Sequence, residues 1–544
     1  MGEQVTKVAV IGLGPRGVGA LEALAERMRH DPKTLTIDVF DPSQDPGAGP
    51  NFQPDESPLC LLNIPMRDID IRPPSFSSCG RFGDWLGHPP PPDSFPTRAD
   101  LGRYLEARLR DLMALDALPI TCHATTVTLI RPCTTGWELQ VADRWLGPYH
   151  EVLLTLGQPE TEPDDQLAEW QSHVQQVSAT LAQAYPARAL ERQASAWSGK
   201  RVAIRGLGLS AYDVYRALTT AQGGVFEGDS YRPSGREPEK VIAFSLDGHA
   251  PFPKPETTQL DAVFDPLASE TKAFAAALDL AVGADPERAA RLINQPLAET
   301  VARVLTDALV ATQSAQVSEW LQIEWEAPAT QETGSAHDIL ERGIALAEGT
   351  SPPTVGYATG QVWRKWQDTF RAHFNPADVG ADTAKAIVGF DEGLKRYSYG
   401  PPVASAREMR ALVAAGVIDL TFAADPKIAT SPAGWTLKKG AHDITVSVMI
   451  DAVLPSPLLS QIVPPLLPDL MQRGILHPVG DGLAAHTAQD GQVVNAQGQA
   501  APGLCLLGRL ALGSVVAVDS LHDCFGEATH RWAAGVVDRI NQRS

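Results

Sequence analysis

The pattern of hydrophobic and polar residues near the N-terminus changes its period within a short stretch. Residues 8–11 form an apolar run of Val, Ala, Val and Ile, which is typical of a buried parallel strand. After residues 12–17, which read GLGPRG, apolar residues recur at helical spacing, at Val18, Leu21, Leu24, Ala25 and Met28. A second alternating run covers residues 35–40 and ends at Asp41. The pattern therefore predicts a strand, a glycine turn, a helix and a second strand.

A glycine turn in this context predicts a binding site for a dinucleotide. Gly12 permits the tight turn, Gly14 lets a pyrophosphate approach the backbone, and Gly17 lets the helix pack on the strand. The start of the helix presents free N–H groups and a partial positive charge to the phosphates. The carboxylate at the end of the second strand suits a ribose hydroxyl. The predicted site residues are Gly12, Gly14, Pro15, Arg16, Gly17 and Asp41. The alternative is a glycine turn that binds nothing.

The opening pattern recurs about 190 residues later. Residues 202–204 predict a strand, the following residues give G-x-G-x-x-A, and residues 241–246 predict the second strand of the unit. Two such units suggest two nucleotides, a flavin on one and a nicotinamide on the other. The predicted residues of the second site are Gly206, Gly208, Ser210, Ala211 and Asp247. The alternative is a second unit that kept the fold and lost its ligand.

Other segments complete the predicted organisation. The Pro- and Gly-rich residues 42–96 are expected to line a site, as long ordered loops often do. Alanine-rich residues 256–324 predict a helical insertion. Further helices are predicted to begin at residue 97 and to cover 362–374, 406–415 and 530–540. Further strands are predicted at 125–130, 137–141 and 151–157, with 452–454, 493–494 and 504–507 returning to the first sheet.

Bulk composition narrows the class of protein. The 544 residues are ample for two to four domains, and the formal charge of −20 argues against a nucleic-acid surface or an anionic membrane. No segment resembles a transmembrane or secretory sequence. The six cysteines form no CxxC pair and fit reduced cytoplasmic thiols better than a disulfide frame or a metal site. The high content of Ala, Pro and Gly suggests a bacterial source.

The chain resembles the bacterial FAD-NAD(P)-binding protein family, which is related to the class B, N-hydroxylating flavin monooxygenases. The motifs that carry the resemblance are GLGPRG at 12–17, LLNIP at 61–65, FPTRADLGRYL at 95–105, LTLGQPE at 154–160, GLGLSAYDV at 206–214, YRPSGREP at 231–238, YGPPV at 399–403, AVLPSP at 452–457 and GRLALGSVVAVDS at 508–520. Their order and coverage are specific for the family and poorly specific for the reaction.

The resemblance implies an α/β fold with two Rossmann-like dinucleotide-binding domains. A glutathione-reductase-like FAD domain and an NAD(P)-type domain would carry a mainly helical insertion. The implied parts are FAD domain 1–198 and 456–544, NAD(P)-type domain 199–255 and 376–455, and helical insertion 256–375. Beyond the first glycine turn, the residues that the resemblance places near FAD are Asn63, Arg98, Gly157, Gly508, Arg509, Asp519 and Ser520. Asp519 has the alternative reading of a helix N-cap, and Arg98 that of a surface ion pair.

The turn after the second strand of the second unit departs from the family. The family usually carries a basic S-R-R-G-type turn there, whereas this chain reads Ser245-Leu246-Asp247-Gly248. An aspartate at that position accepts from a free ribose hydroxyl and repels a 2′-phosphate, which favours NADH over NADPH or no nicotinamide at all. Arg232 or Arg236 on the preceding loop could supply the missing charge. Leu101 likewise stands where the family more often has tyrosine.

The implied activity is that of an FAD-dependent oxidoreductase acting on a small amine or other nucleophilic metabolite. A single-component monooxygenase of this kind takes electrons from NADH or NADPH and oxygenates its substrate through a C4a-(hydro)peroxyflavin. No catalytic acid or base is identified, although His522 and Asp523 lie in the C-terminal flavin region. The alternatives are a flavin oxidase or dehydrogenase reduced directly by its substrate, with a vestigial NAD(P) site, and a non-catalytic FAD-binding protein. The sequence names neither the substrate nor the oligomeric state.

Overall fold

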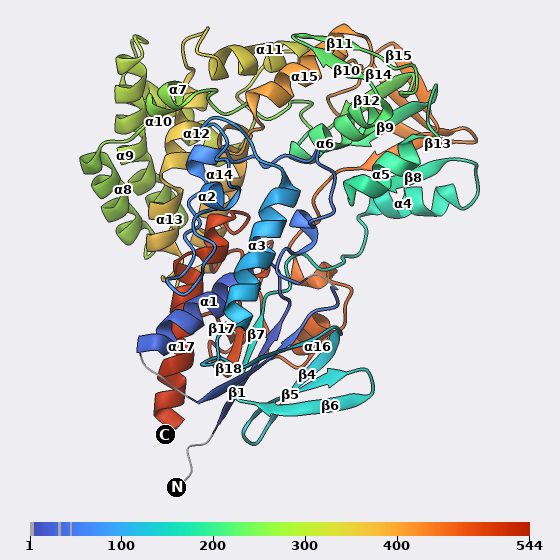
Figure 1. Ribbon diagram of the computed structural model, residues 1–544. Helices are drawn as coiled ribbons and strands as arrows, with labels where there is room; N and C mark the ends of the chain where they lie inside the picture. The colour runs from blue at the N-terminus through green and yellow to red at the C-terminus, as the bar shows by residue number, and fades with distance from the viewer. Residues whose placement is uncertain (1–4, 31–33, 44–45, 544) are drawn as a thin grey trace.

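Two parallel sheets, each carrying one of the glycine turns, organise the computed structural model of the chain (Figure 1). The structure describes residues 5–30, 34–43 and 46–543, so residues 44 and 45 of the predicted 42–96 loop and the outermost residues of the predicted FAD domain lie outside it. The predicted fold class, α/β with two dinucleotide-type units and a helical insertion, is confirmed.

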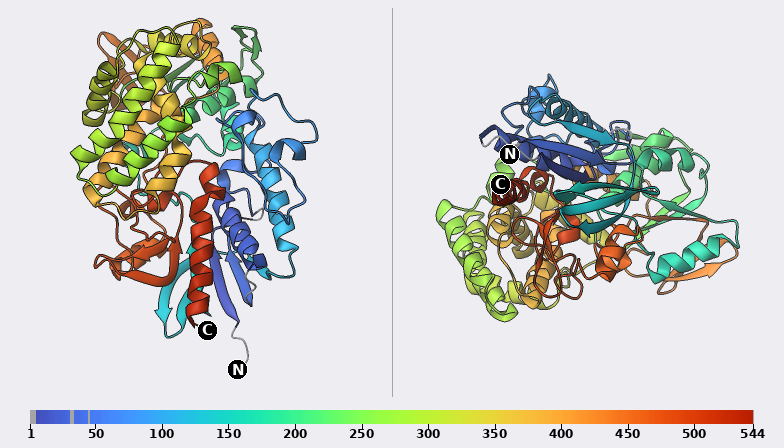
Figure 2. Two further views of the ribbon diagram at one scale, coloured as in Figure 1. Left: turned by 90° about the vertical axis from the view of Figure 1, so that its left-hand side faces the viewer. Right: turned by 90° about the horizontal axis from the view of Figure 1, so that it is seen from below.

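The first sheet has six strands, all parallel except the edge strand β17, which runs antiparallel to its neighbour. In spatial order the strands are β17 (Gln492–Val494), β18 (Ala500–Leu506), β7 (Glu151–Leu154), β1 (Thr6–Ile11), β2 (Leu35–Phe40) and β3 (Ile120–His123). One face is covered by α1 (Pro15–His30), α3 (Arg98–Met113) and α17 (Glu527–Arg543). Figure 2 shows α17, the last helix, running beside α1, the first. N- and C-terminal residues therefore build one domain.

The other face of the first sheet packs on an antiparallel ribbon and a short helix. These are β4 (Val127–Cys133), β5 (Gly136–Val141), β6 (Arg144–Tyr149) and α16 (Leu466–Gln472). The predicted strands at 125–130 and 137–141 are thus confirmed within a few residues. The short elements of the predicted loop region include α2 (Phe82–Trp85), η1 (Pro50–Phe52) and η2 (Met66–Asp68), while η6 (His522–Phe525) precedes α17.

The second sheet is parallel and has four strands. In spatial order they are β12 (Lys240–Phe244), β9 (Arg201–Arg205), β16 (Val448–Asp451) and β8 (Thr180–Gln183). One face packs on α5 (Ala187–Ala194), α6 (Leu209–Leu218), α11 (Ala336–Ala347) and α15 (Val403–Ala414). The other face packs on α4 (Asp165–Val174) and the antiparallel strands β13 (Lys427–Ser431), β14 (Gly434–Lys439) and β15 (His442–Val446). A two-stranded hairpin, β10 (Val225–Glu227) and β11 (Ser230–Arg232), projects beside it.

The helical insertion buries its own core of tryptophan, phenylalanine and tyrosine rings. Its helices are α7 (Thr258–Ala262), α8 (Ala268–Ala281), α9 (Pro286–Asp307), α10 (Ser314–Glu326), α12 (Val355–Lys365), α13 (Gln367–Phe374) and α14 (Ala381–Ser398). Trp363 and Trp366 are fully buried, as expected of a core helix rather than a cofactor box. In Figure 1 this region stands above α17 and opposite the second sheet.

Two features of the fold differ from the sequence-based expectation. Residues 452–454 are not a strand of the first sheet, because the strand is β16, which ends at Asp451 and pairs with β9 in the second sheet. Strand β8 precedes residue 199 and yet pairs with β16. Both strands are only four residues long, and such short runs carry no signal that tells which sheet will accept them. The domain limits otherwise stay predictions.

Candidate cofactor and substrate site

The first glycine turn is shaped so tightly that glycine is required at two of its positions. Gly12 has φ +93°, and a Cβ there would lie 2.5 Å from the carbonyl oxygen of Thr155 on the neighbouring strand. A Cβ at Gly17 would lie 2.6 Å from the carbonyl oxygen of Gly12. Helix α1 begins at Pro15, at the position where a missing N–H is harmless. The predicted strand, turn and helix are confirmed, and the helix starts directly beyond the turn.

Two glycines leave room for close approach to the backbone at the start of α1. A Cβ at Gly14 would find only the Cα of Gly49, at 3.6 Å, and Gly49 itself has φ +66°. Two glycines from separate loops therefore face each other beside the first N–H groups of helix α1. Such a surface suits the diphosphate of a dinucleotide, which needs close backbone approach and N–H donors. These residues fit FAD as the sequence predicts.

Asp41 lies directly beyond β2 and braces the same turn. Its Oδ2 accepts a hydrogen bond from the backbone N–H of Leu13 at 2.6 Å, and its Oδ1 accepts from the N–H of Ser43 at 2.8 Å. The carboxylate is thereby held at the edge of the turn where a ribose would lie. Its contact with a ribose hydroxyl stays a prediction.

Arg16 ties the N-terminal turn to the C-terminal segment. Its guanidinium forms an ion pair with Asp523 at 2.7 Å and donates to the carbonyl oxygens of Val518, at 3.1 Å, and Asp523, at 3.2 Å. A Cβ at Gly508 would lie 2.6 Å from Arg16 Nε, so this glycine makes room for the guanidinium. The side chain of Arg16 is thus committed to protein contacts. Only its backbone N–H, at the helix start, is positioned for the predicted phosphate.

A chain of charges continues through the C-terminal segment. Arg509 and Lys395, which lies on α14, both pair with Asp519, at 2.7 and 2.8 Å. Burial raises the pKa of Asp519, but the two cations outweigh burial and hold the pKa below its ordinary value. Arg509 also donates to the side chain of Gln158 at 2.8 Å, next to Gly157, whose φ is +64°. Asp519 therefore joins the helical insertion to the first domain.

The neighbours of Asp519 have local structural roles. Ser520 accepts from the N–H of His522 at 3.2 Å and so helps to form the turn that leads into η6. The ring Nε2 of His522 lies 2.8 Å from the carbonyl oxygen of Asp68, and burial lowers the pKa of the ring. The ring of His522 is thus held against backbone atoms of the loop around Asp68, which is a structural contact. Proton transfer by His522 or Asp523 stays a prediction.

Arg98 forms an ion pair between the two domains. Its guanidinium pairs with Asp213 of α6 at 2.7 Å and donates to the carbonyl oxygen of Leu61 at 3.3 Å. Tyr185 donates its hydroxyl to the same carboxylate at 2.6 Å. The side chain of Asp213 is only 4% exposed, so this ion pair is buried. The alternative that the sequence left open for Arg98, an ion pair on the surface, is therefore wrong. Arg98 thus fixes the flavin-domain loop against α6.

The second glycine turn is more open than the first. Gly206 has φ +115°, and a Cβ there would lie 3.2 Å from the carbonyl group of Ala452. Gly208 precedes α6, and a Cβ there would meet nothing within 4 Å. Ser210 and Ala211 lie in the first turn of α6, where Ala211 is buried. The helix start is therefore accessible, as the predicted nicotinamide site requires.

Asp247 is neutralised by a cation that the sequence did not reveal. Its Oδ2 forms an ion pair with Arg396 of α14, and its Oδ1 accepts from Ser245 Oγ at 2.8 Å and from the N–H of His249 at 3.1 Å. Burial raises the pKa of Asp247, but these hydrogen bonds and Arg396 bring it below its ordinary value. Arg232 pairs instead with Glu227 on the β10–β11 hairpin. Repulsion of a 2′-phosphate by Asp247 alone is therefore offset by Arg396.

Sequence reasoning missed a buried group of cations beside Asn63. The carbonyl oxygen of Asn63 accepts a hydrogen bond from Lys254 Nζ. Lys254 is 6% exposed, and burial together with the charge of Arg364 lowers its pKa to about 7. Arg67, four positions after Asn63, packs against the same segment by donating to the carbonyl oxygen of Pro255 at 3.2 Å. Lys254 and Arg364 lie in segments that carry no family motif, so only the fold brings these residues together.

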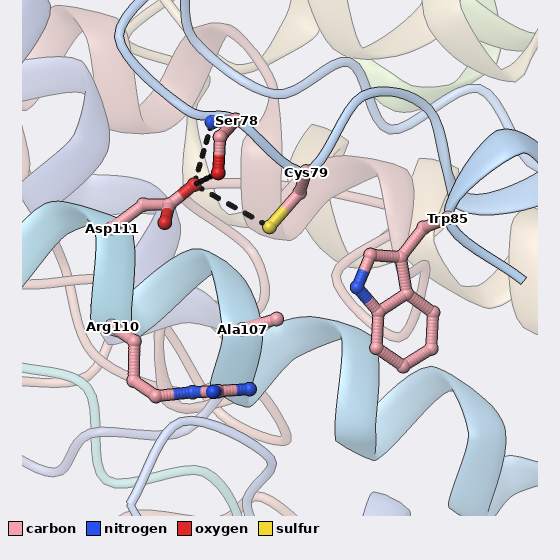
Figure 3. A pocket seen from close by; sticks show the side chains of 6 residues that line it. All are labelled: Ser78, Cys79, Trp85, Ala107, Arg110 and Asp111. Atoms are coloured by element: carbon pink, nitrogen blue, oxygen red, sulfur yellow. Dashed lines mark hydrogen bonds between the residues drawn. The ribbon is translucent and has the colours of Figure 1, made fainter.

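A separate cavity of about 260 Å³ lies beside α3 and is lined by Ser78, Cys79, Trp85, Ala107, Arg110 and Asp111. Figure 3 shows Ser78 and Cys79 both directed at the carboxylate of Asp111. That carboxylate accepts from the backbone N–H of Ser78 at 2.6 Å, and burial raises the pKa of Cys79. The contacts fasten the loop to α3, and the thiol is not activated.

Comparison with known proteins places these features in a context. Residues 9–159 match a family model described as FAD-NAD(P)-binding. Nitrosuccinic acid synthase of Aspergillus oryzae is 25% identical over 541 residues, covering 87% of this chain and 82% of that protein. An L-aspartate N-monooxygenase (nitrosuccinate-forming) of Streptomyces cremeus is 27% identical over 567 residues, covering 86% of this chain and 82% of that protein.

Two solved structures share the fold over nearly the whole chain. The ornithine N-hydroxylase of Kutzneria sp. 744, solved with reduced FAD, NADP+ and L-ornithine, has a TM-score of 0.51 at 14% identity and covers 99% of this chain and 100% of its own. The FAD-bound cadaverine monooxygenase of Erwinia amylovora has a TM-score of 0.51 at 11% identity, with coverages of 99% and 95%. Among the described residues, no helix is both long and apolar enough to cross a membrane.

Proposed function

We propose that this chain, an FAD-dependent oxidoreductase whose residues 9–159 match the FAD-NAD(P)-binding family, is a single-component N-monooxygenase that uses NADH or NADPH to oxygenate an amino acid. The predicted family resemblance, flavin cofactor and monooxygenase class are confirmed by the comparisons. L-Aspartate is the first substrate to test. Of two relatives that align over more than four fifths of the chain, one is named as an L-aspartate N-monooxygenase that forms nitrosuccinate and the other as a nitrosuccinic acid synthase.

The observation that carries this proposal is the closure of one cofactor cradle by both ends of the chain. The glycine turn after β1 supports the predicted diphosphate site, and the ion pair between Arg16 and Asp523 fastens the C-terminal segment over it. When bound, FAD accepts hydride from a nicotinamide and activates O2 for transfer of one oxygen atom to an amine. The protein binds, orients and excludes water around that chemistry.

The second glycine turn supports a nicotinamide site. Gly208 leaves the start of α6 open, and Arg98 fixes α6 against the flavin-domain loop through Asp213. Arg396 beside Asp247 makes NADPH acceptable, since a guanidinium at the end of the second strand can face a 2′-phosphate. We further propose a reducing, cytoplasmic setting, which is supported by six cysteines that are all free thiols in the structure.

A two-stage assay tests this function. Anaerobic mixing of the flavoprotein with NADPH or NADH should bleach the flavin absorbance, and admission of O2 with L-aspartate should give a product with added oxygen on nitrogen, detected by mass spectrometry. Bleaching by L-aspartate without a nicotinamide would favour a substrate-reduced oxidase or dehydrogenase instead. Tight FAD retention with no bleaching by any donor would mean a non-catalytic flavin-binding protein.

A further inference from the structure

We propose that Lys254 and Arg67, with Arg364 beside them, form a carboxylate-binding site that makes this enzyme select an acidic substrate. The inference rests on the proposed function, since it names the part of the substrate that the protein holds while the amine is oxygenated. Its test below measures binding without turnover, so that failure of the site and failure of the oxygenation are separate results.

Three segments that are distant in the sequence bring these cations together. Arg67 lies in η2, within the loop that the sequence predicts to lie near the flavin. Lys254 lies between β12 and α7, and Arg364 lies in the last turn of α12. The first two reach across to each other's loop: Lys254 donates to the carbonyl oxygen of Asn63, and Arg67 donates to that of Pro255. The cations therefore meet at the junction of flavin domain, second unit and helical insertion.

Lys254 is a buried lysine on which Asp68 and Asp261 act only from beyond ion-pair distance. It is 6% exposed, and among the residues that the structure describes it forms no ion pair. Its ammonium has three donors, and the backbone carbonyl of Asn63 takes one of them. Burying an ammonium without an anion is costly, so proteins rarely keep one unless it has a partner or a task.

Arg67 adds an unsatisfied donor to the same place. Its side chain is 9% exposed, one NH2 group pairs with Asp93 at 2.5 Å, and the other donates to Pro255. Its Nε is buried and, within the described part of the chain, has no hydrogen-bond partner, while the nearest carboxylate oxygen paired with it, Asp68 Oδ1, lies 3.9 Å away. Buried unpartnered N–H groups are uncommon in native proteins, and a bound ligand is one reason for them.

The carboxylates around this group do not balance it evenly. Asp261 is the one fully buried acid among them, at 4% exposure, and it is shared by Arg364 and Lys365. The other paired acids, Asp68, Asp93 and Asp265, are 31%, 37% and 55% exposed, so solvent screens their charges. Within the described residues, the buried part of the group thus keeps hydrogen-bond donors without partners on Lys254 and on Nε of Arg67. The three nitrogens of Arg364 are taken by Gln361, Asp68 and Asp261.

A carboxylate matches these donors. It accepts several charge-assisted hydrogen bonds from ammonium and guanidinium groups at once, which an amide or a hydroxyl cannot do. Anchoring the acid end of an amino acid here would hold its amine beside the loop of Asn63, where the sequence predicts the flavin. A phosphate could bind the same donors, so the test compares the two anions.

The test uses the FAD-loaded enzyme and succinate, a dicarboxylate that has no amine to oxidise. Isothermal titration should detect succinate binding, and succinamide, which has the same shape without the charges, should bind at least about tenfold more weakly. Inorganic phosphate at equal ionic strength should not compete. This comparison needs no variant, so it remains decisive even if a substitution in the buried cluster prevents folding.

Two variants then locate the binding. Lys254→Met keeps the apolar stem and removes the ammonium, and it should raise the Kd for succinate about tenfold or more. Circular dichroism of the variant checks that it is folded. The matched control is Lys240→Met, because Lys240 on β12 also donates to a backbone carbonyl, that of Gly416 at 2.5 Å, but lies outside the cluster. The control should bind succinate as the unmodified enzyme does.

Several results would overturn the proposal. One is succinate binding that survives Lys254→Met, another is equal binding of succinate and succinamide, and a third is phosphate displacing succinate. Absence of succinate binding to the unmodified holoenzyme would also exclude the site. If succinate binds as expected but no amine is oxygenated, the site stands and the proposed function fails.

Discussion

The two glycine turns have nearly the same sequence pattern but are built differently. In the first, neighbouring backbone crowds Gly12 and Gly17 so closely that no side chain fits, and the C-terminal segment is fastened over the turn by Arg16 and Asp523. In the second, a Cβ at the equivalent Gly206 would lie 3.2 Å from the carbonyl group of Ala452, and the position that corresponds to Gly17 is already occupied by Ala211. The first turn is therefore packed tightly into the fold, which suits a cofactor that stays bound. The second turn is more open, which suits a cofactor that binds and dissociates in each reaction cycle.

Replacing one glycine in each turn should have the largest and most unequal effects. Gly12→Ala places a Cβ 2.5 Å from the Thr155 carbonyl at φ +93°, and should cost about 4 kcal/mol of unfolding free energy and abolish FAD retention. Gly206→Ala, at the equivalent position of the second turn, places a Cβ 3.2 Å from the Ala452 carbonyl at φ +115°, and should cost about 2 kcal/mol while FAD content stays unchanged. Denaturant unfolding and flavin absorbance measure both. Equal loss of FAD in the two variants would contradict the distinction between the turns.

Breaking one ion pair at each unit should give the next largest difference. Asp523→Asn leaves the 11% exposed guanidinium of Arg16 buried without a counterion, which should cost about 3 kcal/mol. The guanidinium of Arg396 is nearly as buried as that of Arg16, but its partner Asp247 is 34% exposed whereas Asp523 is 4% exposed. Water can therefore replace the Asp247 carboxylate, and Asp247→Asn should cost less than about 1 kcal/mol. Thermal unfolding of the two variants side by side measures the contrast. A similar cost for both would mean that the C-terminal closure is not a structural fastening.

The fold could be predicted from sequence further than the site could. Periodicity and the two G-x-G motifs predict β1, α1, β9 and α6, because burial on a parallel sheet demands apolar runs. Strand β8 was missed since four residues, Thr180–Gln183, carry no usable period. Arg396 and Lys254 were missed because their roles come from packing between segments far apart in the chain. Isolated cations in a sequence show no sign of which carboxylate, carbonyl or ligand they will face.

The proposed carboxylate site of Lys254 lies at the junction of the two units, and its binding of an acidic substrate should depend on pH. Burial and Arg364 lower the pKa of Lys254 to about 7, while Asp68 and Asp261 oppose that shift and Arg67 adds to it. Since a carboxylate binds the ammonium form, which is lost as the pH rises through 7, the Kd for succinate should increase about tenfold from pH 6 to pH 8. Titration calorimetry at several pH values checks this, and Lys254→Met should remove the dependence. A flat profile in the unmodified enzyme would contradict the proposed role of the ammonium.

The smallest expected effect concerns the choice between NADH and NADPH at the second unit. Asp247→Asn removes a negative charge and releases Arg396 to face a 2′-phosphate, so the ratio of kcat/KM for NADPH over NADH should rise about threefold. Asp247→Arg should shift it in the same direction and further. Flavin reduction rates with each nicotinamide give the ratio. No change in either variant would show that Asp247 does not face the ribose.

The most direct measurement is a titration of the purified apoprotein with FAD. Calorimetry measures the binding, and thermal unfolding measures the melting temperature with and without FAD. One FAD should bind per chain and raise the melting temperature, because the first glycine turn and the segment pinned by Arg16 hold it only in the folded state. Asp523→Asn should weaken that binding and reduce the rise. A folded apoprotein that binds no FAD and melts at the same temperature with and without it would contradict the central claim.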